Sequence, residues 1–298
     1  MKLTRDNFGQ LLTPIHKKIV WETYNEKPEE YPRIFKIGTM DRKEISYPHM
    51  GGFGMWDENE EGGTINQDTM HEGEVATFTT ARYDKGYPIT WELVQDDLYN
   101  VMRGMGSKGG SAQALGKGLR VTCETLAADV INKGFTNTGY DGVALFDNDH
   151  PLADSSSLGN NLISGALSDS TLKTALTNFR GQVDEANLKI QAIANRLFIA
   201  ANLEFTAYTI QRSEKVADEL SNNANVLPRL EIIIMDYLTD GYWGIQDSSI
   251  ENLLFFWRNK PLFDGQPIQN TLDWLFFGYA RMTCGYNNWR GIAASAGA

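Results

Sequence analysis

The 298-residue sequence has few of the features that mark secreted or membrane-spanning proteins. Its two cysteines, Cys123 and Cys284, stand far apart within apolar patterns, which is typical of buried thiols in a reducing cytoplasm. No apolar run approaches the roughly 20 residues that a membrane span needs, and residues 1–7 lack a signal-peptide pattern. We therefore expect a soluble chain without a disulfide framework.

Basic residues are also scarce: the sequence has 27 Lys and Arg against 38 Asp and Glu, which gives a net charge of −11. Nucleic-acid affinity comes largely from Lys and Arg that displace counterions, so this balance disfavours tight binding to a polyphosphate backbone. A protein that only encloses nucleic acid has no such need. Residues 57–74 hold seven acids and no Lys or Arg, which is typical of a solvated face; an intersubunit contact is the alternative.

Catalytic motifs are lacking as well. None of the four histidines stands in a recognisable nucleophile or base context. The densest polar cluster contains Asp147, Asp149 and His150, and carboxylates beside an imidazole can bind a divalent metal. Its spacing matches neither an EF-hand nor a zincin, so the sequence favours a hydrogen-bonded turn without metal or cofactor. A metal-dependent hydrolase stays open as an alternative.

The first third of the chain predicts two extended features. Apolar residues at helical spacing in 8–24 predict an amphipathic arm, and residues 31–96 carry β-rich pieces around a glycine-rich apolar centre. This second segment predicts a long two-stranded excursion with too little apolar surface for a core of its own. Its side chains Phe53, Met55 and Trp56 are therefore expected to contact another part of the assembly.

The rest of the chain alternates helix and strand patterns. The clearest helix covers 115–134, where apolar residues recur at three- and four-residue steps. Ser168 is a predicted N-cap for the next helix, and Asn202 for the one after it. The strands predicted here cover residues 88–94, 197–200, 230–235, 253–257 and 272–284.

Three stretches keep their order across about 150 residues of the C-terminal half. The first is Gly-Val-Ala-Leu-Phe-Asp at 142–147 with Asp-His-Pro-Leu-Ala at 149–153. The second joins Asn-Leu-Glu-Phe-Thr-Ala at 202–207 to Asn-Val-Leu-Pro at 225–228 and Asp-Tyr-Leu-Thr-Asp at 236–240. The third is Trp-Arg-Gly-Ile at 289–292. In this order the chain resembles the major capsid proteins of tailed phages, and among them the Mu-like major head subunits.

The resemblance implies the α+β HK97 fold. Its parts would be an N-terminal arm (1–30), an extended loop with flanking strands (31–96), a peripheral domain (97–167 and 268–298) with spine helix 115–134, and an α/β axial domain (168–267). The residues expected to act in assembly are Phe53, Met55 and Trp56 in the extended loop, Glu214, Lys215, Asn222 and Asn223 in the axial loop, and Phe8, Leu12 and Ile15 in the arm.

The function implied is that of a structural head protein and not an enzyme. Copies would assemble into hexamers and pentamers of an icosahedral shell that encloses double-stranded DNA without sequence-specific binding. The implied partners are other copies, a separate scaffolding protein, a portal and decoration proteins, and the chain would be made in the cytoplasm of a bacterial host. An encapsulin-like nanocompartment shell is the alternative with the same fold.

Overall fold

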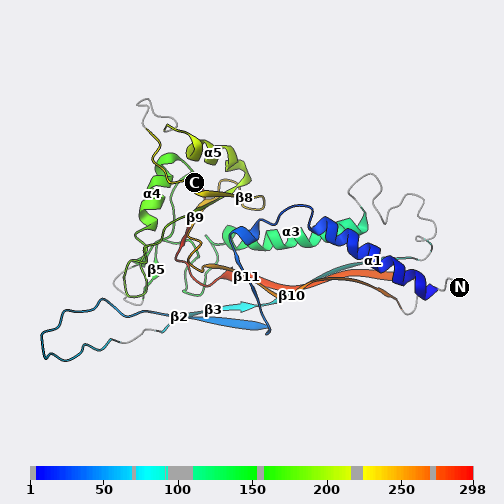
Figure 1. Cartoon of the computed structure of the whole chain (residues 1–298), viewed down its shortest axis with the longest axis horizontal. Helices are drawn as coiled ribbons and strands as arrows, with labels where there is room; N and C mark the ends of the chain where they lie inside the picture. Colours follow the sequence, from blue (N-terminus) through cyan, green and yellow to red (C-terminus); the bar gives the residue numbers. More distant parts are fainter. Residues whose placement is uncertain are drawn as a thin grey trace.

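The computed structural model describes residues 5–68, 72–90, 92, 110–152, 158–215, 224–268 and 273–297. Long strands run along much of the molecule, a compact α/β part lies over one end of them, and a hairpin projects beyond that end (Figure 1). The helices are α1 (Arg5–Tyr24), α3 (Ser111–Asn132), α4 (Asp169–Phe179) and α5 (Glu204–Arg212), with 3-10 turns η1 (Tyr31–Arg33) and η2 (Ala201–Leu203).

Within the described residues, the strands form two four-stranded sheets and two short pairs. The long sheet has the order β1 (Lys36–Thr39), β10 (Leu253–Pro267), β11 (Trp274–Tyr286), β4 (Ala81–Ile89). The compact sheet has the order β12 (Ile292–Ser295), β9 (Trp243–Gln246), β7 (Arg196–Ala200), β8 (Glu231–Met235). The pairs are β2 (Glu44–Met50) with β3 (Glu72–Thr79), and β5 (His150–Pro151) with β6 (Leu158–Gly159).

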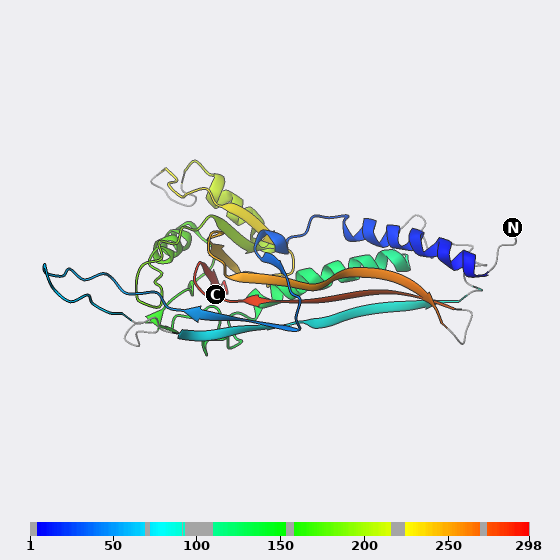
Figure 2. The same ribbon diagram turned by 60° about the horizontal axis from the view of Figure 1, so that its bottom comes forward.

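Helix α3 covers one face of the long sheet, as Figure 2 shows. Side chains alternate between the two faces of a strand, so Ala280 and Met282 of β11 both point toward the helix and are fully buried. The thiol of Cys123 on α3 lies 3.7 Å from the sulfur of Met282. Burial raises the pKa values of the Cys123 and Cys284 thiols to about 12, which keeps both thiols protonated and unreactive at neutral pH.

The compact part has a second core between α4, α5 and the β7–β9 pair. Its largest fully buried side chains include Leu172, Phe179 and Trp243. Helix α4 begins at the predicted N-cap, since the Ser168 hydroxyl accepts a hydrogen bond from the Thr171 amide at 3.2 Å. That prediction is confirmed.

Several expectations differ from the structure. Asn202 does not cap α5, because it lies in η2 and its side chain accepts from the Gly241 amide. The strand expected at 88–94 ends at Ile89, and Glu92 is helical. Strand β10 continues ten residues past Trp257 by shifting its register twice. Strand β10 falls within the predicted axial segment 168–267 but pairs in the long sheet. Strand β12 falls within the predicted peripheral segment 268–298 but pairs in the compact sheet.

Candidate assembly surfaces

The first surface is the end of the β2–β3 hairpin, which projects furthest from the rest of the chain (Figures 1 and 2). Strand pairing stops at Met50 and Glu72, and the described residues 51–68 beyond it form no strand. Here Phe53 is 53% exposed, Met55 79% and Trp56 96%. The three side chains predicted from the sequence thus lie on one projecting segment, and each is more than half exposed. We call residues 51–68 the hairpin tip.

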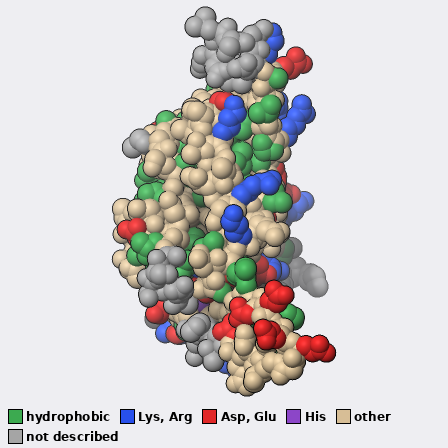
Figure 3. Space-filling model, turned by 90° about the vertical axis from the view of Figure 1, so that its left-hand side faces the viewer, with side chains coloured by type: hydrophobic (Ala, Val, Ile, Leu, Met, Phe, Trp, Pro, Cys, Tyr) green, Lys and Arg blue, Asp and Glu red, His purple; other side chains and the backbone are tan. Residues whose placement is uncertain are grey.

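The tip is also strongly acidic. Its five acids, Asp57, Glu58, Glu60, Glu61 and Asp68, stand in a segment without Lys or Arg. Figure 3 shows acidic side chains gathered on the hairpin at the bottom of that view. The Asp68 carboxylate accepts from the Gly54 amide at 2.8 Å, which holds the two sides of the tip together. The tip therefore combines exposed aromatic side chains with negative charge.

The root of the hairpin, in contrast, is anchored by aromatic rings. Phe78 of β3 packs edge-on against Tyr47 of β2 and Phe256 of the long sheet, with ring centroids 5.8 and 5.3 Å apart. The ring of His49 stacks on Tyr140 at 5.0 Å, and its Nε2 donates to the carbonyl of Asn287. These contacts fix the direction in which the tip projects.

The second surface is the N-terminal arm, which forms α1. Phe8, Leu12 and Ile15 fall within this helix, and their side chains lie outside the described part of the structure. The second half of α1 packs on α3, where a Cβ on Gly116 would lie 2.4 Å from the Val20 carbonyl oxygen. That half of the arm therefore rests on its own subunit.

A buried histidine joins α1 to the long sheet. Nε2 of His16 shares a 2.6 Å hydrogen bond with the Tyr87 hydroxyl, and the imidazole stacks on Phe276 at 4.2 Å. Burial lowers the pKa of His16 to about 4, because the charged imidazolium would lose its hydration there. The helix is therefore docked through a neutral imidazole.

The third surface is the predicted axial loop. Glu214 and Lys215 are exposed just after α5, and Asn222 and Asn223 lie outside the described residues. The two ends of the loop are held together, since the Asn225 amide donates to the Glu214 carbonyl at 3.0 Å. At the other end of α5, Phe205 is 81% exposed, and the sequence did not point to it as an assembly residue. The sequence pattern does not single out Phe205, because α5 carries other apolar residues and helical spacing alone does not show which face is exposed.

The polar cluster considered for metal binding is used in hydrogen bonding. His150 is fully buried, with Nδ1 2.6 Å from Asp141 Oδ2 and Nε2 3.1 Å from Asn161 Oδ1. The Asn161 amide nitrogen donates to the carbonyls of Leu145 and Trp289, so its oxygen must be the acceptor toward His150. Both ring nitrogens of His150 thus face acceptor oxygens.

The two aspartates of that cluster do not converge on the histidine. Asp147 Oδ1 accepts from the amides of Asn148 and Asp149, at 2.7 and 3.2 Å, which makes an Asx turn. Asp149 itself is exposed. Among the described residues, no group of three or more His, Cys, Asp or Glu side chains is placed to hold a metal ion. In that same part of the chain, no helix is long and apolar enough to cross a membrane.

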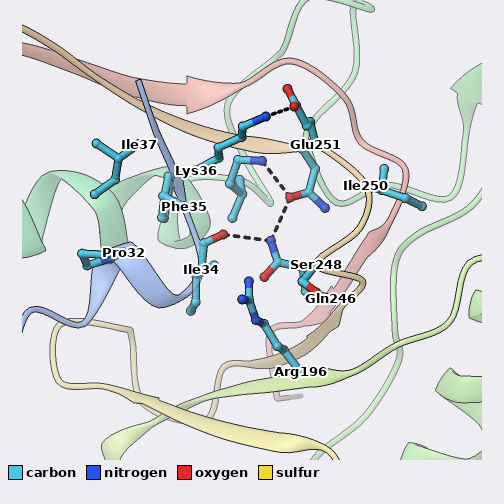
Figure 4. Close-up of a pocket in the computed structure, with 12 residues that line it drawn as sticks. Pro32, Ile34, Phe35, Lys36, Ile37, Arg196, Gln246, Ser248, Ile250 and Glu251 are labelled. Carbon is cyan, nitrogen blue, oxygen red and sulfur yellow. Dashed lines mark hydrogen bonds and ion pairs between the residues drawn. The ribbon is translucent and has the colours of Figure 1, made fainter. Parts of the chain in front are cut away.

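A cavity of about 400 Å³ opens between η1–β1 and the turn that joins β9 to β10 (Figure 4). The Gln246 side-chain nitrogen donates to the Ile34 carbonyl at 3.0 Å and to Asn252 Oδ1 at 2.8 Å, and Lys36 pairs with Glu251. These polar groups bind one another, and none of the lining residues is a histidine. The cavity therefore lies at the joint between the two sheets.

Comparison with known proteins agrees with this architecture. The chain resembles the capsid of cyanophage P-SCSP1u (TM-score 0.60, 11% identity, 90% of this chain and 88% of that chain). It also resembles the capsid of a native GTA particle (0.56, 11%, 89% and 89%) and a virus-like particle from Pyrococcus furiosus (0.55, 11%, 94% and 97%). At these identities the likeness shows the fold alone, which is of the HK97 type. None of the curated proteins matches the sequence.

The family model described as "Phage capsid protein" matches residues 73–295, which is most of the chain. This match covers β3, α3, both four-stranded sheets except β1, and all three stretches of the sequence resemblance. The Mu-like subgroup stays a prediction. The chain belongs to the phage capsid protein family, and it is a structural major capsid protein of the HK97 type, a component of the virion head.

Proposed function

We propose that copies of this chain assemble into hexamers and pentamers of an icosahedral shell that encloses double-stranded DNA. The observation that supports this proposal best is the hairpin tip, where Phe53, Met55 and Trp56 are exposed on a segment that projects away from the rest of the chain. Burial of such side chains is worth roughly 1.5–3 kcal/mol each, so contact with a neighbouring copy is strongly favoured. Repeated around closed symmetry, modest contacts of this kind stabilise a shell.

Each part of the chain would then have an assembly role. The hairpin is the extended loop that crosses onto a neighbour, and α3 is the spine of a peripheral domain built on the long sheet. The compact sheet with α4 and α5 is the axial domain, and the loop after Lys215 lies where five or six copies meet. The first turns of α1 form an arm toward neighbouring copies.

The net charge of −11 fits a container better than a DNA-binding protein. An acidic wall repels packaged DNA and lets it slide, so sequence-specific contacts are not needed. A separate scaffolding protein, a portal and decoration proteins would complete the head, and the chain would be made in the cytoplasm of the bacterial host.

The test is the assembly state of the purified chain, measured by size-exclusion chromatography and negative-stain microscopy. We expect closed particles from the wild type. The double variant Phe53→Ser, Trp56→Ser should stay folded by circular dichroism and remain small. A matched control is Ile193→Ser, which removes an exposed side chain, 57% exposed, just before the compact sheet. A wild type that stays monomeric with its scaffold present would contradict the proposal, and particles that carry protein cargo in place of DNA would indicate a nanocompartment.

A further inference from the structure

A cavity in the compact part of the molecule has a basic lining. It has a volume of about 510 Å³ and lies between the C-terminal half of α5 and the start of β8, at the outer end of the compact part (Figure 1). The lining residues are Tyr208, Gln211, Arg212, Arg229, Leu230 and Ile232. They include two arginines and no acid, although the whole chain has 38 acids against 27 Lys and Arg. We call this site the arginine cavity.

Neither arginine of the cavity is neutralised within the described part of the chain. Arg229 forms no ion pair there, and Glu231, the acid two residues after it, is bound by two other arginines. Arg212 forms no ion pair with a described residue either, and its guanidinium lies 4.3 Å from the ring centroid of Tyr208. A guanidinium stacked in this way keeps the N–H groups at its edge free to donate. Two uncompensated positive charges therefore stand at the cavity.

A buried amide group beside these arginines also lacks an acceptor. Gln211 Oε1 accepts a hydrogen bond from the Leu230 backbone amide at 3.0 Å, which fixes the direction of the Gln211 side chain. The Nε2 atom of the same side chain is buried and has no hydrogen-bond partner among the described residues. A buried donor without a partner is unfavourable, so each such group in a structure needs an explanation. An anion bound in the cavity would provide the missing acceptor.

A phosphate group matches this set of donors better than a carboxylate does. It has three terminal oxygens and a charge of about −1.5 to −2 at pH 7, which balances two arginines. A carboxylate has two oxygens and one charge, which a single guanidinium can bind in a bidentate pair. The cavity also falls within the roughly 300–1,000 Å³ that is usual for small-molecule sites, so it has room for more than the phosphate.

We propose that the arginine cavity binds the phosphate group of a small phosphorylated molecule. Arg212 and Arg229 donate to the phosphate oxygens, and Gln211 Nε2 gains an acceptor. The chain's net charge of −11 disfavours a nucleic-acid backbone as the source of that phosphate. The site lies within one subunit, so this proposal goes beyond the assembly function and does not depend on it.

Isothermal titration calorimetry of the whole chain with inorganic pyrophosphate at pH 7.5 tests the site. We expect the wild type to bind pyrophosphate at one site per subunit. The double variant Arg212→Gln, Arg229→Gln should raise the Kd by at least about tenfold, because it removes two charge-assisted contacts. Arg180→Gln, which removes an exposed arginine at the end of α4, is the matched control and should leave the Kd unchanged.

Gln211→Glu provides a second variant that keeps the local structure. The new carboxylate can still accept from the Leu230 amide, but it replaces Nε2 by an acceptor oxygen and adds a negative charge. The Kd for pyrophosphate should therefore rise in this variant as well. Circular dichroism and the Tm of each variant establish that the loss of binding does not come from unfolding.

Several results would overturn the proposal. Pyrophosphate that does not bind to the wild type, or that binds equally well to the arginine double variant, would exclude the site. Citrate, which carries a similar charge on carboxylates, should bind more weakly, and equal binding would mean that the cavity does not select phosphate. A short oligodeoxynucleotide that binds more tightly than pyrophosphate through the same arginines would assign the cavity to nucleic acid instead. None of these measurements requires particles, so the shell proposal stands or fails separately.

Discussion

The imidazole of His150 lies flat against the indole of Trp289, with ring centroids 4.3 Å apart and planes inclined by 8°. The two residues are 139 positions apart in the chain and belong to two of the three stretches on which the family resemblance rests. The second stretch also makes a long-range contact, because the Asn202 side-chain oxygen accepts a hydrogen bond from the amide of Gly241, the residue that follows 236–240. The stretches that mark the family are therefore joints that hold distant segments together.

His150→Ala should destabilise the subunit by about 3 kcal/mol, because it removes the stack on Trp289 and leaves Asp141 and Asn161 buried without their partner. Denaturant unfolding of the unassembled subunit measures this loss. Asp149→Ala, at the neighbouring exposed position, should change stability by no more than about 0.5 kcal/mol. Equal stability of the two variants would contradict a structural role for His150, and a hydrolytic activity lost in Asp149→Ala would revive the metal hypothesis.

Much of the fold follows from sequence patterns where one force dominates. The helix predicted at 115–134 is α3 at 111–132, because its apolar stripe faces a sheet along its whole length. The exposure of the hairpin tip could also be predicted, because a glycine-rich segment with three large apolar side chains has no neighbouring core that could bury those side chains. In both cases the local pattern and the tertiary outcome agree.

Other features could not be predicted, because distant contacts decide them. β10 continues through the polar residues 258–260 because β11 pairs with it along almost its whole length. β9 has only four residues, and its burial depends on neighbours that the local sequence does not show. The position of Arg82 opposite Arg281 could not be predicted either, since only the register of β11 with β4 brings the two residues together.

Two glycines on α3 allow a matched test of how the arm docks. Ala has a helix propensity about 1 kcal/mol better than Gly, so Gly118→Ala, where a Cβ would meet nothing within 4 Å, should stabilise the subunit. Gly116→Ala gains the same propensity but places its Cβ 2.4 Å from the Val20 carbonyl oxygen, so it should loosen α1. Hydrogen exchange of α1 amides is the measurement. Similar protection in the two variants would show that the close approach of the helices is not needed.

One side chain ties the end of the predicted axial loop to α5. The Asn225 side-chain nitrogen donates to the carbonyls of Ile210 and Ser213, and its oxygen accepts from the Leu227 amide at 3.0 Å. Asn225→Ala should therefore leave the end of α5 without a cap and cost about 1–3 kcal/mol of local stability. Faster proteolytic cleavage after Lys215 would report this opening. Glu214→Ala, which removes an exposed side chain beside the same loop but keeps Lys215, serves as the control for altered recognition by the protease.

Acid should loosen the arm through His16. In the unfolded chain this imidazole takes up a proton near its ordinary pKa of 6.5, but in the folded chain burial lowers the pKa to about 4. Between these values the unfolded state binds more protons, so the stability that His16 contributes is complete above pH 6.5 and declines as the pH falls toward 4. The docking of α1 should weaken across the same window, because the imidazolium cannot stay against Phe276 and Tyr87.

Other groups titrate in this range, so the informative quantity is a difference between variants. His16→Gln keeps a polar side chain that can bond to the Tyr87 hydroxyl and has no proton to gain. Thermal unfolding at pH 7.5 and pH 4.5 should show a smaller loss of Tm for His16→Gln than for the wild type, even if the variant is less stable at pH 7.5. Equal losses in the two proteins would mean that His16 is not the group through which acid acts on the arm.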